Sequence, residues 1–353
     1  MKTVFLTDNE IKDNLFPLTL TRSAADIRVG ILTIREKWEA FLGAPVHLKE
    51  EDAVVPEQAS IVSANIIPSK QFAASLFTAD GQAADNPEWN SVRIIQFPWH
   101  IFQWNDWAIR QDFELLTAGR QHQPLPPGVL AMNESQIFIE AGAKLSPCIL
   151  NAEDGPIYIG RNTKIMEGCM IRGPFALCEG AVVKMGARIY GATTIGPYSI
   201  VGGEIKNAVI LGYSNKAHDG YLGDSVIGEW CNLGAGTSNS NMKNNAGEVK
   251  IYSNVAKELV PSGLQKCGLI MGDYSRAAIN TSFNTGTIVG VSANVFGTGL
   301  TPKFIASFTW GTQPYDRYEF DKALSDIENW KKLKNASLTG QERTRLKCIF
   351  DQN

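Results

Sequence analysis

The residues best suited to acid–base chemistry in this chain surround His218, one of four histidines among 353 residues. A neutral imidazole near pH 7 can take the proton of an attacking amine, while cations and amides hold an anionic substrate and a carbonyl oxygen. This combination predicts a site that transfers a group to an amine; the alternative is a solvated loop histidine without a catalytic role. The candidate partners of the imidazole are Lys206, Lys216, Tyr221, Asn232, Asn241 and Lys243.

A six-residue repeat supplies the framework that must position these residues. An α-helix would place apolar residues three and four apart, and a simple strand would place them two apart. A period of six is typical of a β-helix, in which three short strands make a triangular coil and the aliphatic side chains point into the prism. We therefore expect a left-handed parallel β-helix. The repeated aliphatic residues are Ile159, Ile165, Ile171, Leu177, Val183, Ile189, Ile195 and Val201.

Hexads resume at Ile227 and Leu233, and a last set runs from Met271 to Val295. Two stretches interrupt them, residues 203–220 and 239–268, and both look too long and irregular for coil corners. Insertions in repeat folds map to loops on one face, where binding residues often lie. His218 falls in the first of these stretches, so we expect the candidate site on a loop that leaves the prism.

The chain divides into three parts. Residues 1–125 alternate strand-like and helix-like segments and predict an α/β domain. The Pro- and Gly-rich stretch AGRQHQPLPPGV links it to the β-helix of residues 126–312. Residues 313–353 form a tail in which we expect a helix that caps the open end of the prism. The apolar spacing of this helix comes from Phe320, Leu324, Ile327 and Leu333.

Composition excludes several classes of protein. A net charge of −3 without a basic run argues against nucleic-acid binding. The N-terminus reaches Asp8 too soon for a signal sequence, and no run of eighteen apolar residues occurs, so we expect a cytoplasmic protein with no membrane partner. The six cysteines contain no Cys-x-x-Cys pair and are interpreted as core thiols. A zinc enzyme of the carbonic anhydrase class needs three histidine ligands, and the repeat region offers only His218, so no metal site is predicted there.

The loop after the first predicted strand carries Arg22 and Arg28, near the strand end where ligands of open α/β sheets bind. Two arginines there could clamp phosphates, although both also fit a solvated loop. The strand, the polar loop and Phe16-Pro17-Leu18-Thr19 followed by a basic residue resemble the opening of sugar-nucleotide pyrophosphorylases. PWHIFQWNDWAIRQDF resembles the end of this domain in a divergent group of such proteins. The family's Gly-x-Gly-x-Arg and Pro-Lys are absent, and the domain is shortened.

A second resemblance covers residues 189–245 in detail and the β-helix in outline. NKAHDGYLGDSVIGEWCNLGAGT resembles the acetyltransferase half of the bifunctional N-acetylglucosamine-1-phosphate uridyltransferase and glucosamine-1-phosphate N-acetyltransferase family. In that family a histidine three residues before a tyrosine precedes Leu-Gly-Asp, two hexads and Gly-Ala-Gly-Thr; the histidine loop is one residue shorter here.

This resemblance implies that His218 is the general base that deprotonates the sugar amine. Tyr221 and Asn232 would contact the substrate and the transition state, and Arg188 and Lys206, one coil apart, would hold the sugar phosphate. Further implied contacts are Asn241 with the sugar, either Lys243 or Lys250 with the phosphate, and Ala235 in the acetyl-coenzyme A groove.

The resemblances together imply a bifunctional enzyme of UDP-N-acetylglucosamine synthesis. Acetyl-CoA would be the acetyl donor, Mg²⁺ would serve the nucleotidyltransferase half, and a sugar phosphate and a nucleotide triphosphate would be substrates. Acyltransferases of this fold are trimers, so a homotrimer is expected. Two alternatives remain open: a sugar-1-phosphate nucleotidyltransferase whose β-helix only assembles or regulates it, and a non-catalytic trimeric scaffold.

Overall fold

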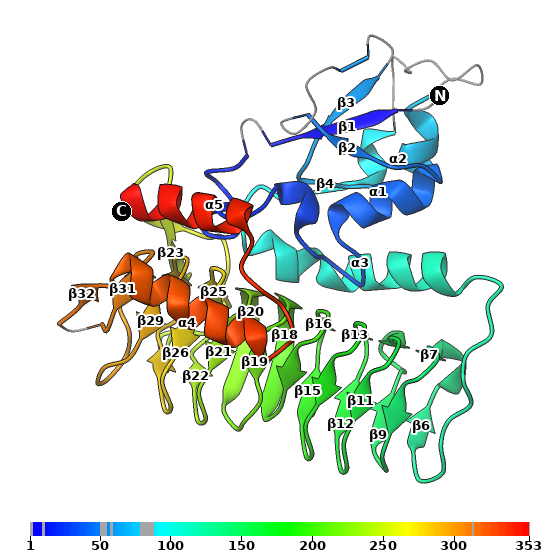
Figure 1. The fold of residues 1–353 in the computed structure, drawn as a ribbon. Helices are drawn as coiled ribbons and strands as arrows, with labels where there is room; N and C mark the ends of the chain where they lie inside the picture. Colours follow the sequence, from blue (N-terminus) through cyan, green and yellow to red (C-terminus); the bar gives the residue numbers. More distant parts are fainter. Residues whose placement is uncertain are drawn as a thin grey trace.

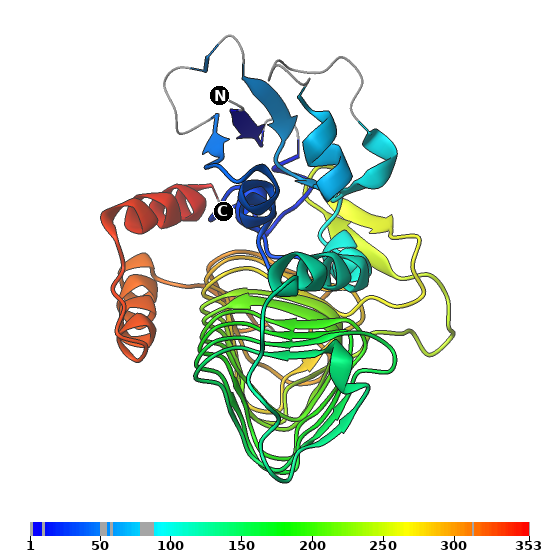
Figure 2. The same cartoon turned by 90° about the vertical axis from the view of Figure 1, so that its right-hand side faces the viewer.

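The computed structural model describes residues 3–8, 11–49, 55–56, 59–77, 88–312 and 314–352. Its larger part is a prism of stacked coils, whose triangular outline Figure 2 shows end-on. A smaller α/β layer from the N-terminal residues lies along one side of the prism (Figure 1). The predicted α/β domain, parallel β-helix and C-terminal helix are therefore confirmed.

Successive coils contribute short parallel strands to three faces of the prism. Face I holds β6 (Leu130–Met132), β9 (Ile149–Asn151), β12 (Met170–Arg172), β15 (Arg188–Tyr190), the first residues of β18 (Glu204–Gly212) and β20 (Tyr221–Glu229), β22 (Ser238–Asn239) and β27 (Ser282–Phe283). Face II holds β7 (Ile137–Ile139), β10 (Ile157–Ile159), β13 (Phe175–Leu177), β16 (Thr193–Ile195), the last residues of β18 and β20, β25 (Leu269–Met271), β28 (Thr287–Val289) and β30 (Phe304–Ile305). Face III holds β8 (Lys144–Leu145), β11 (Lys164–Ile165), β14 (Val182–Val183), β17 (Ile200–Val201), β19 (Asn215–Lys216), β21 (Asn232–Leu233), β26 (Arg276–Ala277), β29 (Asn294–Val295) and β31 (Thr309–Trp310).

The period-six aliphatic residues form the interior of the prism. All eight, from Ile159 to Val201, are at most 2% exposed. In-register pairs such as Ile165 with Val183, and Val183 with Val201, stack the row from coil to coil. Burying each side chain contributes about 1.5 to 3 kcal/mol before conformational entropy is counted, so this row is a large part of the core.

The expectation that residues 203–220 leave the prism is wrong. They form β18 and β19, which pair with coils on both sides. The hexad phase is lost because the coil is shorter: Thr194 pairs with Val209, fifteen residues later, whereas Phe175 pairs with Thr193, eighteen residues later. Residues 240–268 do leave the prism, as predicted, and carry the antiparallel hairpin of β23 (Lys250–Ser253) and β24 (Glu258–Pro261).

The N-terminal layer has a three-stranded parallel sheet in the order β2 (His47–Leu48), β1 (Val4–Thr7), β3 (Ser60–Ser63). Thr33 and Glu36 form a capping box that begins α1 (Ile34–Leu42), and Gly43 in the left-handed region ends it. The remaining elements are α2 (Lys70–Ser75), the antiparallel pair β4 (Ile66–Ile67) and β5 (Arg93–Ile94), α3 (His100–Thr117), and the 3₁₀ turns η1 (Ala24–Asp26), η2 (Trp89–Ser91) and η3 (Glu134–Gln136).

Face II of the prism is covered by this layer, with α3 lying across it (Figures 1 and 2). The Asn105 side chain on α3 donates to the Ala192 carbonyl at 2.8 Å and accepts from the Gly30 backbone N–H at 2.7 Å. Outward residues of face II such as Val226 and Ile288 belong to the same buried cluster as the sheet residues of the N-terminal layer. The interface between the two parts is therefore one continuous hydrophobic cluster. Among the described residues, face I and the coils of face III that α4 does not contact remain for a ligand.

The C-terminal tail forms α4 (Phe320–Lys332) and α5 (Gly340–Asp351). Contrary to expectation, α4 does not cap the open end of the prism. It runs alongside the coils, from β31 toward β19 (Figure 1), where Leu324 and Ile327 pack in a cluster with Trp230 and Phe308. Leu333 is 74% exposed. The last strand of face III is covered instead by the short antiparallel β32 (Asp316–Arg317).

Within the described ranges, none of the helices has the length and apolar character that crossing a bilayer requires.

Candidate active site

His218 occupies a corner of the prism, residues 217–220, between β19 on face III and β20 on face I. The corner is stacked tightly between its neighbours. A Cβ at Gly203 would come within 2.8 Å of the His218 carbonyl oxygen, and on the other side the Gly236 backbone N–H donates to the Asp219 carbonyl at 3.0 Å. Gly203, at φ +72°, therefore leaves the room that this corner needs.

The imidazole of His218 is exposed and forms no hydrogen bond with the part of the chain that the structure describes. It borders an open groove of about 480 Å³ along the edge between faces III and I. Met185 lies two coils before His218 and Ile279 two coils after it, so the groove extends roughly 20 Å at the coil spacing of a β-helix. Small residues line its middle, and Ala235 is among them. The structure thus brings His218 and Ala235 together.

Three of the predicted substrate contacts lie next to this corner on face I. Arg188 pairs with Glu204, Glu204 pairs with Tyr221, and Tyr190 pairs with Lys206. The expectation that Arg188 and Lys206 are equivalent positions one coil apart is wrong, because the coil between them has lost two residues. Lys206 lies two positions further along its strand, and since alternate residues share a face, both cations still project from face I.

The charges on face I leave Lys206 as the less neutralised cation. The half-exposed Arg188 guanidinium lies 3.6 Å from the Glu204 carboxylate, which also accepts the Tyr190 hydroxyl at 2.7 Å. The Lys206 ammonium lies 5.7 Å from the Tyr190 ring and forms no ion pair with a described residue. An anionic group placed here would meet two cations, which are opposed by one carboxylate.

A hydrogen-bond network orients Asn241 beside Tyr221. The Asn241 Nδ2 atom donates to Asp224 Oδ2 at 2.5 Å and to the Tyr221 hydroxyl at 3.1 Å, and Asn207 Nδ2 donates to Asp224 Oδ1 at 2.7 Å. Because the Asn241 amide nitrogen makes both contacts, its Oδ1 remains an acceptor for a ligand. Burial, with the charge of Asp224, raises the pKa of Tyr221, so the phenol stays protonated.

Asp224 and Asn207 were missed by sequence reasoning, although Asp224 belongs to the Leu-Gly-Asp of the family motif. Both residues have positive φ, at the edge between faces I and II, and the Asp224 side chain is buried. Their contact across neighbouring coils depends on the shortened coil, which the sequence pattern does not reveal.

Asn232 lies on a different face from Tyr221. It belongs to β21 on face III, where it pairs with Asn215 and Arg276. Its strand leads into the corner that holds Ala235. Within one chain, the edge of the prism separates Asn232 from Tyr221.

The two lysines proposed for the second phosphate contact, Lys243 and Lys250, both lie near Lys303. The Lys243 ammonium donates to the Glu248 carbonyl at 3.2 Å, and the Lys303 ammonium donates to the Lys250 carbonyl at 3.1 Å. Burial and the nearby charge of Lys243 both lower the pKa of Lys303. Lys303, which sequence reasoning missed because it comes from a much later coil, is therefore a cation near Lys243.

The two arginines of the N-terminal loop are occupied by other parts of the chain. The Arg22 guanidinium lies 2.9 Å from Glu229 and also contacts Asp273, two acidic residues of the β-helix. Arg28 donates to the Ile31 carbonyl and lies 3.5 Å from Glu36. Both guanidinium groups are largely buried, so the structure does not present them together in an open cleft.

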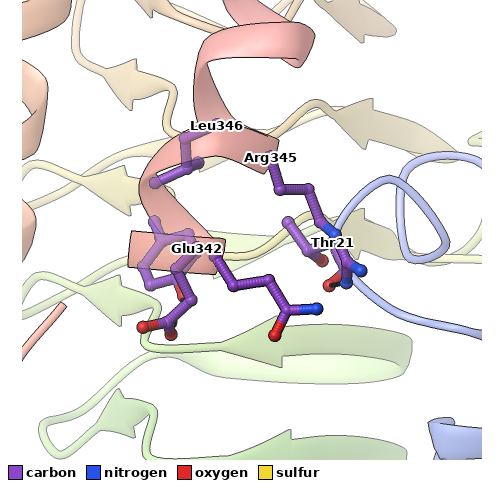
Figure 3. Close-up of a pocket in the computed structure, with 6 residues that line it drawn as sticks. Thr21, Glu342, Arg345 and Leu346 are labelled. Carbon is purple, nitrogen blue, oxygen red and sulfur yellow. Dashed lines mark hydrogen bonds between the residues drawn. The ribbon is translucent and has the colours of Figure 1, made fainter. Parts of the chain in front are cut away.

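The pocket beside this loop, drawn in Figure 3, is a small gap where three parts of the chain meet. It has about 60 Å³, enough for a few water molecules but not for a nucleotide. The Tyr274 hydroxyl donates to Glu342 at 2.9 Å, and Arg345 donates to the Thr21 carbonyl. No group of three or more His, Cys, Asp or Glu residues suited to a metal occurs in the described ranges. Mg²⁺ at a nucleotide site is usually held by one or two carboxylates together with the substrate phosphates, so the Mg²⁺ implied by the resemblance stays a prediction.

Comparison with known proteins finds a family model that matches the N-terminal part of the chain. Residues 4–84 and 48–121 match the model of a sugar nucleotidyl transferase family. The chain is 29% identical over 202 residues to a bifunctional sugar-1-phosphate nucleotidylyltransferase/acetyltransferase of Sulfurisphaera tokodaii, covering 56% of this chain and 43% of that protein. It is 32% identical over 167 residues to the bifunctional protein GlmU of Methanocaldococcus jannaschii, covering 42% of this chain and 40% of that protein.

A third relative is the uncharacterized acetyltransferase YaiX of Escherichia coli O6:K15:H31, 27% identical over 187 residues, which are 48% of this chain and 76% of that protein. The chain spans less than half the length of the two bifunctional relatives. These similarities confirm both resemblances that the motifs indicated, and they support a transferase.

Proposed function

We propose that the β-helix transfers an acetyl group from acetyl-CoA to the amine of an amino-sugar phosphate at the corner of His218. The observation that carries this proposal is the exposed imidazole of His218, which opens onto a long groove beside a cationic strand face. The similarity to bifunctional nucleotidylyltransferase/acetyltransferases agrees with it.

In this proposal the acceptor amine attacks the thioester carbonyl carbon, and His218 takes the proton that the amine loses. The C–S bond of the tetrahedral intermediate then breaks, and the CoA thiolate leaves and is protonated. Imidazole suits the first step because its usual pKa lies near neutral pH. The groove past Ala235 has the length and the small lining residues that an extended thioester arm would need.

The acceptor would lie on face I. Arg188 and Lys206 would hold its phosphate, while the Tyr221 hydroxyl and the Asn241 Oδ1 atom would contact its hydroxyl groups. Lys243 would supply a further cation. Glucosamine 1-phosphate satisfies these requirements, because it combines an amine, hydroxyl groups and a phosphate on one ring.

We further propose a homotrimer. Face II is covered by the N-terminal layer, so face I and the coils of face III that α4 does not contact would meet the neighbouring subunits. Asn232 on face III would then meet the substrate of an adjacent chain rather than its own. Sedimentation at micromolar protein should give the mass of a trimer; a monomer would contradict this arrangement.

The test of acetyl transfer is thiol release from acetyl-CoA with the purified full chain and glucosamine 1-phosphate. Release should require both substrates and fall strongly when glucosamine, which lacks the phosphate, replaces the sugar phosphate. Absence of thiol release across a panel of amino-sugar phosphates, with a chain that is shown to be folded, would overturn the proposal.

Nucleotidyl transfer to the sugar 1-phosphate, giving UDP-N-acetylglucosamine, is the second candidate. It is favoured by the family match of residues 4–121, whereas the internal ion pairs of Arg22 and Arg28 weigh against it. Pyrophosphate release from UTP and a sugar phosphate, without thiol release, would favour a nucleotidyltransferase with a structural β-helix. If neither thiol nor pyrophosphate is released, the results would favour a non-catalytic scaffold. Cytoplasmic localisation stays a prediction.

A further inference from the structure

Lys216 occupies a position where the prism otherwise holds small or aliphatic side chains. It belongs to the inward row of face III, pairs with Val201, and precedes the coil of Leu233. Its side chain is nevertheless buried, with 2% of the residue exposed. Burying an ammonium group is unfavourable unless hydrogen bonds compensate it. Packing alone therefore does not explain a lysine at this position.

The ammonium of Lys216 has one hydrogen-bond acceptor in the described chain, the backbone carbonyl of His218, at 2.5 Å. The carbonyl groups of Lys216, Asp219 and Gly220 accept backbone N–H groups of neighbouring coils. The His218 carbonyl is instead held from inside the prism by a side chain that lies two residues earlier. Backbone hydrogen bonds thus hold the corner at Asp219 and Gly220, whereas at His218 itself the contact comes from the Lys216 ammonium.

We propose that Lys216 is a positioning residue for His218, whose carbonyl it fixes from inside the prism so that the imidazole projects into the groove beside Ala235. The inference rests on the proposed acetyl transfer. The carbonyl carbon and Cβ of His218 are both bonded to its Cα, so anchoring the carbonyl restricts the direction in which the side chain leaves the backbone. A displacement of about 1 Å of a catalytic group is enough to slow a reaction by up to 10²-fold.

The protonation state of Lys216 is consistent with this role. Burial lowers the pKa of Lys216 to about 8, and the charge of Asp219 opposes the decrease. The amine is therefore mostly protonated at neutral pH and donates a charge-assisted hydrogen bond.

The test compares the full chain with Lys216→Met, which fills the same space without the charge, and with the matched control Lys334→Met. Lys334 also donates to a backbone carbonyl, that of Tyr198, but lies just beyond the end of α4. For Lys216→Met we expect kcat of acetyl transfer to fall about 10- to 100-fold and KM for acetyl-CoA to change less than about threefold. The melting temperature at neutral pH should rise, because the variant no longer buries an ammonium. Lys334→Met should keep the wild-type kcat.

A second measurement separates this inference from the proposed function. The Hε1–Cε1 NMR signal of His218, assigned by its loss in His218→Ala, should shift or broaden in Lys216→Met and stay in place in Lys334→Met. If the wild-type protein releases no thiol, the proposed acetyl transfer is wrong, but the NMR comparison still tests whether Lys216 positions the His218 imidazole. An unchanged His218 signal, or a Lys216→Met variant with wild-type kcat, would overturn the role of Lys216.

Discussion

Two places in the molecule carry cations that the sequence offered as phosphate contacts, and the structure treats them in opposite ways. On face I, Arg188 is half-exposed and Lys206 has no acidic partner among the described residues. In the N-terminal loop, Arg22 is buried between Glu229 and Asp273 of the β-helix. Arg188 and Lys206 are therefore open to a ligand, whereas Arg22 joins the N-terminal loop to the β-helix.

The difference follows from what lies over each segment. In the described part of the chain, no element covers face I near Arg188, whereas the N-terminal loop packs against the prism together with α3 and α5 (Figure 2). An arginine that enters such a joint must be neutralised there, because an unpaired buried charge is too unfavourable. A cation on a predicted loop is therefore informative about binding only when the surface above it stays open.

The largest effect should come from His218→Ala. Loss of a general base typically lowers the rate 10²- to 10⁴-fold, so kcat for thiol release should fall by that amount while the melting temperature changes little. His122→Ala is the matched control, since His122 is also exposed but lies in the linker before β6. Wild-type thiol release by His218→Ala would remove the corner from the mechanism.

A second prediction sets Arg22→Met against Arg188→Met. Removing Arg22 leaves Glu229 and Asp273 without their partner, so the free energy of unfolding should drop by about 3 to 5 kcal/mol in urea titration. Arg188→Met should change it by less than about 1 kcal/mol and instead raise KM for the sugar phosphate. The comparison fails if Arg22→Met is as stable as wild type but binds UTP more weakly.

The sequence predicted the prism well because its signal is local and repeated. Each aliphatic from Ile159 to Val201 points inward, so a fixed period was sufficient. The pattern failed at residues 203–220, where shortened coils break the period without breaking the fold. The path of α4 along the coils depends on contacts with Trp230 and Phe308, and no spacing within the helix could reveal them.

The motif predicted His218 and Tyr221 as site residues, and this stays a prediction, but it did not reveal the residues that contact them in the structure. Lys216 reads as an ordinary loop cation until the pairing with Val201 places it inside the prism. Asp224 and Lys303 contact residues that are distant in the sequence, and these contacts depend on strand register rather than on sequence spacing.

A third prediction compares how the free energy of unfolding depends on pH at the buried Lys216 and at an exposed surface lysine. Because burial lowers the folded-state pKa of Lys216 to about 8, the unfolded chain binds more protons between pH 8 and the ordinary lysine pKa near 10.5. Stability of the wild type therefore rises with pH across this window, relative to a variant without the amine. Lys216→Met should be more stable than wild type at pH 7, by about 1 to 3 kcal/mol, and should lose this advantage by pH 10.

Lys332→Met, at an exposed lysine of α4, should show a difference from wild type that does not vary over the same range. Denaturant titrations at several pH values would measure all three proteins. A constant difference between Lys216→Met and wild type would mean that the ammonium is not buried as the structure shows.

The smallest effect should come from Asp224→Asn, which tests the hydrogen-bond network of Asp224, Asn207 and Asn241 at the edge between faces I and II. The carboxylate of Asp224 accepts hydrogen bonds from the side-chain amides of Asn207 and Asn241. In Asp224→Asn one carboxylate oxygen becomes an NH₂ group, so a donor would face the NH₂ group of Asn241 or Asn207. Asn241 would then lose its fixed orientation, so KM for the sugar phosphate should rise about 5- to 10-fold, the effect of roughly one hydrogen bond. KM for acetyl-CoA should stay unchanged, because the groove lies on the other edge of the face.

Asp154→Asn, at an exposed carboxylate on an earlier coil, is the control and should alter neither constant. Equal changes in both constants for Asp224→Asn would show that the residue supports the coil as a whole rather than the acceptor side of the site.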